Sequence, residues 1–98
     1  MVQYKDVELL KNAVEEQYAC TASLRRGKYL SEQLFGGISW EGEVYQFKLE
    51  GAKDVREVFA WMSHAAGDKQ DKIHMVPKTS EVKTPKHALI VEYIREQQ

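Results

Sequence analysis

The segment from Trp40 to Trp61, WEGEVYQFKLEGAKDVREVFAW, constrains the fold more than any other part of the chain. It holds both tryptophans and two of the three phenylalanines of the sequence. Its first half, Trp40 to Leu49, is rich in β-branched and aromatic residues, as strands are, and the polar residues 50–54 after it are typical of a connecting turn. The segment therefore predicts two antiparallel strands joined by a turn near Ala52.

The position of this turn decides which side chains share a face of the sheet. If the turn centres near Ala52, Tyr45 lies opposite Phe59 and Leu49 lies opposite Val55. Because side chains alternate along a strand, one face then holds Tyr45, Phe47, Leu49, Val55, Phe59 and Trp61, and the other holds Trp40, Val44, Val58, Ala60 and Met62. Both faces are apolar, so other parts of the molecule must cover each of them.

The second half of the segment also fits a helix. Four apolar residues follow the spacing of a helical stripe: Val55, Val58, Phe59 and Met62. Asp54 and Glu57 before and within this stripe fit a helix-capping pair. Periodicity alone therefore leaves strand and helix open over residues 54–66.

Part of the sequence resembles an uncharacterised family of small bacterial α+β proteins. The family pattern is W-x-G-x-V-x-x-F-x-L-x-G, a short turn and an aromatic-A-W triplet, and this chain matches it at Trp40, Gly42, Val44, Phe47, Leu49, Gly51 and Phe59-Ala60-Trp61, with Glu32, Gly36 and Thr84-Pro85 also in register. The resemblance implies strands near residues 56–64 and 72–77, and so favours a strand over a helix. It implies no activity, although short proteins of this kind are often encoded on mobile gene cassettes. The family turn G-H-P-K-A is replaced here by residues 51–55, so any role of its His-Pro pair is absent.

A helix is predicted at each end of the chain. From Asp6 onward, apolar residues recur at steps of three and four, which indicates an amphipathic helix: Val7, Leu10, Val14 and Tyr18. This helix ends either near Tyr18 or at residues 25–27, where two arginines and a glycine suit a helix C-terminus, and we favour the longer helix. Thr84-Pro85 suits the start of a second helix over residues 85–97, although residues 88–91 taken alone would also suit a strand.

The remaining strands follow from their turn residues. Lys28 to Phe35 fits a strand, and Gly36-Gly37 fits a two-residue hairpin turn, which requires positive φ. A fourth strand is predicted around Ile73 to Val76 and ends at a proline. We therefore predict one α+β domain over residues 1–98, with an N-terminal helix, a four-stranded antiparallel meander and a C-terminal helix, both helices lying on one face of the sheet.

The composition excludes several classes of protein. With 14 Lys and Arg against 15 Asp and Glu, the net charge of −1 provides no overall field that would attract nucleic acid or an anionic membrane. The single cysteine, Cys20, excludes an internal disulfide and a Cys-rich zinc site. The sequence contains no apolar run near the roughly 18 residues that span a bilayer. We expect a soluble, cytoplasmic protein without a cofactor.

Few residues suggest chemistry. A hairpin centred near Lys69 would place His64 opposite His74, as in a metal site, but a third ligand would be needed and exposed histidines are the commoner explanation. Glu41 and Glu43 fit an acid–base pair, yet more often form a charged strand rim. Arg25, Arg26 and Lys28 with Tyr29 would suit phosphate or RNA, although an arginine-rich helix end is the commoner reason for such a cluster.

The aromatic and aliphatic residues of the sheet exceed what two short helices cover. Large apolar faces left uncovered mark partner or ligand sites, and the candidates here are Trp40, Val44, Tyr45, Val58, Phe59, Trp61 and Met62. The leading hypothesis is a non-enzymatic interaction protein that self-associates as a homodimer or higher even oligomer. The alternative is a small-molecule-binding protein or small enzyme whose pocket lies between sheet and helices, lined by Trp40, Tyr45, Phe59 and Trp61.

Overall fold

The computed structural model describes residues 4–33, 39–63 and 72–97, which form two helices and one four-stranded sheet. The elements follow one another as α1 (Tyr4–Tyr18), β1 (Thr21–Gln33), β2 (Ser39–Glu50), β3 (Glu57–Ser63), β4 (Lys72–Pro77) and α2 (Pro85–Gln97). Neighbouring strands pair antiparallel in chain order. The predicted α+β meander between two helices is confirmed, and the segment after the turn is a strand. The predicted Gly36-Gly37 turn lies outside the described residues.

Helix α1 is the shorter of the two alternatives that the sequence left open. It ends at Tyr18, Ala19 adopts a left-handed φ of 51°, and the Cys20 N–H donates to the Glu15 carbonyl over 3.2 Å. From Thr21 onward the backbone pairs with β2. The prediction that the helix continues to Gly27 is therefore wrong, because residues 21–27 are extended and pair with β2 instead.

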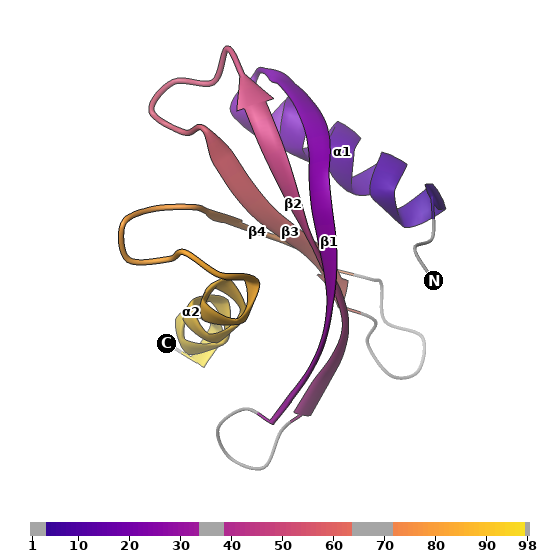
Figure 1. The fold of residues 1–98 in the computed structure, drawn as a ribbon, viewed down its shortest axis with the longest axis vertical. Helices are drawn as coiled ribbons and strands as arrows, with labels where there is room; N and C mark the ends of the chain where they lie inside the picture. Colours follow the sequence, from indigo (N-terminus) through magenta and orange to yellow (C-terminus); the bar gives the residue numbers. More distant parts are fainter. Residues whose placement is uncertain (1–3, 34–38, 64–71, 98) are drawn as a thin grey trace.

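The two helices cover opposite faces of the sheet (Figure 1). On one face, α1 packs Val7, Leu10 and Val14 against residues that include Phe47 and Leu49. On the other, α2 buries Ala88 and Leu89 against a second cluster: Leu30, Val44, Phe59, Trp61, Val76 and Val82. The prediction that both helices lie on one face is wrong. Because both faces are apolar, one helix at each end of the chain is needed to cover them.

The register of β2 against β3 differs by one residue from the prediction. Tyr45 pairs with Ala60 and Phe47 pairs with Val58, so Phe59 and Trp61 lie on the α2 face rather than beside Tyr45. A shift of one residue exchanges the faces of a whole strand. The cause is the turn over residues 51–56, which the Leu49 N–H closes on the Arg56 carbonyl at 2.8 Å. Positive φ at Gly51 (92°) and Asp54 (66°) allows this longer turn.

A β-bulge lets β1 contribute to both faces. Leu24 pairs with Phe47, whereas Arg26 pairs with Gln46, so Arg25 is an extra residue without a partner of its own in the register. Before the bulge, Ala22 belongs to the cluster under α1. After it, Leu30 belongs to the cluster under α2. The even-numbered residues of β1 therefore change faces at Arg25.

The start of α2 agrees with the sequence. Thr84 caps the helix, because its Oγ1 accepts the His87 N–H at 3.1 Å and its carbonyl accepts the Ala88 N–H at 3.0 Å. Pro85 is the first helical residue. In the described part of the chain, neither helix has the length and apolar character that a membrane span requires.

Candidate functional site

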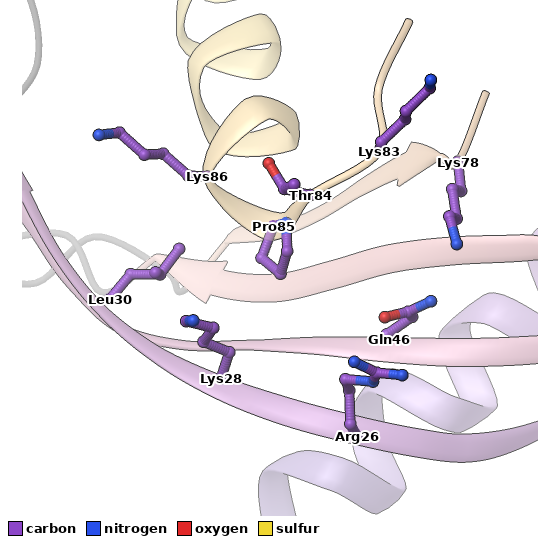
Figure 2. A pocket seen from close by; sticks show the side chains of 9 residues that line it. All are labelled: Arg26, Lys28, Leu30, Gln46, Lys78, Lys83, Thr84, Pro85 and Lys86. Carbon is purple, nitrogen blue, oxygen red and sulfur yellow. The ribbon is translucent and has the colours of Figure 1, made fainter. Parts of the chain in front are cut away.

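A cavity of about 510 Å³ lies between the sheet and the start of α2 (Figure 2). This volume falls within the range of about 300–1,000 Å³ that ligand pockets occupy. Strand β1, strand β2, the segment after β4 and the first turn of α2 all contribute side chains to its wall: Arg26, Lys28, Leu30, Gln46, Lys78, Lys83, Thr84, Pro85 and Lys86. We call this cavity the α2 groove.

The wall of the α2 groove is strongly cationic. Of the nine described residues that line it, five are Lys or Arg and none is Asp or Glu, although the whole chain carries a net charge of −1. In Figure 2, Arg26 and Lys28 rise from β1 on one side, while Lys83 and Lys86 lie around the start of α2 on the other. Like charges gathered around a cavity focus the local potential. The groove therefore attracts anions.

The first turn of α2 adds to this positive potential. Thr84 and Pro85 line the groove at the N-terminal end of a helix of 13 residues. Pro85 has no N–H and the His87 N–H is bonded to Thr84, so the contribution of this helix end comes from the macrodipole, which places partial positive charge there. The helix end and the lysines therefore act in the same direction.

Glu57 organises one end of the groove. The Gln46 Nε2 donates to Glu57 Oε1, and Glu57 Oε2 lies 3.5 Å from Arg25 Nη1 and 3.8 Å from Lys78 Nζ. These contacts join β1, β2, β3 and the segment after β4. The single carboxylate offsets part of the charge at this end and fixes the orientation of Gln46, which is buried.

Of the four residues that the sequence suggested for an aromatic pocket, three lie on one face of the sheet and one on the other. Tyr45 is buried on the α1 face, whereas Trp40, Phe59 and Trp61 belong to the cluster under α2. None of these four lines the groove. The other interface candidates also lie in the chain's own core or against it: Val44 and Val58 are buried, and Met62 packs on the α1 cluster.

His74 lies in a buried contact between the sheet and α2. Its side chain is 4% exposed, its ring stacks on Trp61 with centroids 5.4 Å apart, and its Nδ1 lies 2.9 Å from Glu92 Oε2. Trp61 is also its partner in the strand register, so the predicted pairing of His74 with His64 is wrong. His64 itself lies outside the described residues. Over residues 4–33, 39–63 and 72–97, no group of three or more His, Cys, Asp or Glu has the arrangement of a metal site.

Two further titratable side chains, Tyr29 and Cys20, each lie near a carboxylate. The Tyr29 hydroxyl donates to the Glu41 carboxylate, and this hydrogen bond raises the pKa of Tyr29. Cys20 is half-buried, and burial together with the Glu15 carboxylate raises the pKa of its thiol. A raised pKa disfavours the reactive thiolate, so Cys20 is not activated as a nucleophile.

The sequence indicated only some of the residues that line the groove. The basic cluster predicted at residues 25–28 supplies Arg26 and Lys28, but on a strand rather than at a helix end. Lys78, Lys83 and Lys86 surround the Thr84-Pro85 cap about 50 residues later, and the fold brings them opposite β1. Three lysines spaced around a helix start were the signal that could have identified the second wall.

No family model, no curated protein and no solved structure matches this chain.

Proposed function

We propose that this protein is a non-enzymatic binding protein whose ligand is anionic and occupies the α2 groove. The observation that supports the proposal is the lining itself, in which five cationic side chains and a helix N-terminus surround the cavity and no carboxylate is found among the described lining residues. The site lies between sheet and helix, where the sequence suggested a pocket, but its wall is cationic rather than aromatic.

The lining favours binding over catalysis. Its polar members are lysine and arginine side chains, the Gln46 amide and the Thr84 hydroxyl, and within the described part of the chain it includes no His, Cys, Asp or Glu. Those absent types are the usual general acids, bases and nucleophiles near neutral pH. Arg26 can hold a carboxylate or phosphate with two parallel hydrogen bonds, and the lysines contribute point charges. Such a wall binds and orients an anion.

Calorimetric titration with inorganic phosphate, pyrophosphate and tripolyphosphate at low salt tests the proposal. Affinity should rise with the charge of the anion and fall as salt is added, because the exposed cations are screened. Lys28→Gln on one wall and Lys83→Gln on the other should each weaken tripolyphosphate binding by roughly two- to fivefold. This loss of affinity corresponds to the free energy that an exposed ion pair contributes. Lys53→Gln, in the turn between β2 and β3, removes the same charge outside the groove and should leave the affinity unchanged. Absence of binding, or equal losses in all three variants, would refute the proposal.

Self-association is a separate proposal, and it can no longer rest on an uncovered apolar face of the sheet. The apolar second face that motivated it is covered by α2, and Val44 at its centre is only 1% exposed. Among the described residues, β1 and β4 are the two edge strands of the sheet, and the outer edge of β1 is one surface on which a second copy could pair. Two copies of β1 paired about a two-fold axis near Gly27 would place Arg26 and Lys28 opposite one another, which is unfavourable for like charges. Sedimentation velocity over a range of protein concentrations measures the outcome.

A further inference from the structure

Strand β1 is an edge strand that borders the α2 groove. Among the described residues it pairs with β2 alone, along its whole length from Thr21 to Gln33. The side chains of residues 23–29 are exposed. An exposed edge of this length presents backbone hydrogen-bonding groups to an additional strand.

The hydrogen-bonding pattern identifies which backbone groups of β1 are directed outward. The Leu49 N–H donates toward β3, to Arg56, so odd-numbered residues of β2 direct their backbone groups away from β1. Their partners in β1 must likewise point away from β2. After the bulge these partners are Gly27, Tyr29 and Ser31, which pair with Tyr45, Glu43 and Glu41.

The beginning of β1 supports this assignment. Ala22 pairs with Leu49, and its N–H donates outward to Glu15 Oε2 of α1 at 2.8 Å. Glu15 therefore occupies the outward position at the start of the edge. The outward groups of Gly27, Tyr29 and Ser31 follow farther along the strand.

The side chains between these outward backbone groups line the α2 groove. Arg26, Lys28 and Leu30 alternate with Gly27 and Tyr29, and all three belong to the wall of the cavity. A strand added beside β1 would place every second side chain on this face, with its Cβ about 4.5–5.5 Å from that of its β1 partner. Carboxylates two residues apart in such a strand would reach Arg26 and Lys28.

We propose that the ligand of the α2 groove is an extended acidic peptide that adds to β1 as a fifth strand. This inference rests on the proposed anion-binding function and specifies its ligand. The backbone of the peptide pairs with Gly27, Tyr29 and Ser31, and acidic side chains two residues apart contact Arg26 and Lys28 and face Lys83 and Lys86 across the groove. Recognition of this kind takes affinity from main-chain hydrogen bonds and specificity from alternate side chains.

Two features favour a peptide over other anions. The described residues of the lining include no aromatic ring on which a nucleotide base could stack, so these residues would hold a nucleotide through its phosphates alone. Cations on an edge strand also protect it from aggregation. That role alone would not require further cations on the opposite wall of the groove. Here Lys83 and Lys86 line the same cavity from a distant part of the chain.

The test uses the full chain and a fluorescent peptide of alternating glutamate and threonine with blocked ends, measured by anisotropy. A peptide of the same composition with all its glutamates adjacent is the sequence control. We expect the alternating peptide to bind at least about fivefold more tightly, because only its carboxylates share one face of a strand. Lys28→Gln should weaken its binding by roughly two- to fivefold, and Lys53→Gln should not.

Backbone methylation separates strand addition from general charge attraction. In an antiparallel arrangement the threonine amides face β1, so N-methylation of the threonines abolishes binding while N-methylation of the glutamates is tolerated; a parallel arrangement reverses the two. Loss with one set and not with the other supports the proposal. Equal binding of both methylated peptides and the unmodified peptide would overturn it.

Competition between tripolyphosphate and the peptide distinguishes a failure of the peptide proposal from a failure of the anion-binding function on which it rests. A peptide bound beside the groove should be displaced by tripolyphosphate, since both use the same cations. If tripolyphosphate binds with the expected dependence on Lys28 and Lys83 but the alternating peptide does not bind, the inference fails and the anion-binding function stands. If neither binds, both fail.

Discussion

Replacing Trp61 by alanine removes the largest buried side chain from the cluster that joins the sheet to α2. The indole is 2% exposed and packs among residues of β1, β2, β4 and α2. Truncation of a large aromatic side chain in a core costs about 3–5 kcal/mol, which includes the cavity that it leaves. The stacked contact with His74 contributes about 0.5–1.5 kcal/mol beyond the buried area. We expect a total loss near the upper end of the first range.

A loss of this size is a large part of the stability of any small domain, which is typically about 5–15 kcal/mol. Urea unfolding followed by far-ultraviolet circular dichroism measures it, with Trp61→Phe as a milder variant that keeps an aromatic ring in place. Tyr29→Ala is the matched control, because Tyr29 is an aromatic residue on the same sheet that is 56% exposed. The control should change the free energy of unfolding by no more than about 0.5 kcal/mol. A loss below about 1 kcal/mol for Trp61→Ala, with an unchanged denaturant slope, would refute the packing described for α2.

Three further predictions concern a cap, a turn and a thiol. Thr84→Ala should lower the free energy of unfolding by about 1 kcal/mol because it removes the acceptor of the His87 N–H, and Thr84→Ser should restore it in the same urea titration. Gly51→Ala should cost about 1 kcal/mol in thermal unfolding, since the added Cβ meets no atom within 4 Å and only the positive φ opposes it; a neutral result would contradict that conformation. Cys20 should react slowly with iodoacetamide at pH 7, because its raised pKa keeps the thiol protonated, and faster as pH rises toward that pKa. Glu15→Gln, which removes one cause of the shift, should accelerate alkylation at a given pH, and an unchanged rate would count against it.

The sequence predicted correctly those features of the fold that depend only on residues close together in the chain. The Thr84-Pro85 cap predicted the start of α2, and apolar spacing placed Val7, Leu10 and Val14 in the core. Periodicity did not decide between strand and helix for residues 57–63, because both put the same apolar residues on buried faces; the structure makes them β3.

The errors came from quantities that no local pattern determines. The turn after β2 extends to Arg56, and this difference of one residue moved Phe59 and Trp61 to the opposite face. With the faces exchanged, Phe59 and Trp61 share a layer with Trp40, and Tyr45 lies in the other layer. The cationic wall could not be found from the basic cluster alone, because Lys83 and Lys86 line the same cavity as Arg26 and Lys28 only through the placement of α2.

The bulge at Arg25 has a consequence for how the length of this chain can vary. Leu24 pairs with Phe47 and Arg26 with Gln46, so a chain from which Arg25 is deleted could keep both pairings and the faces of every other residue in β1. A deletion elsewhere in the strand would exchange faces for all residues on one side of it. The deletion of Arg25 would remove the ion pair with Glu57 and reduce the local twist, but it would leave the core and the groove lining in place. This position can therefore lose one residue while the two layers of the fold persist.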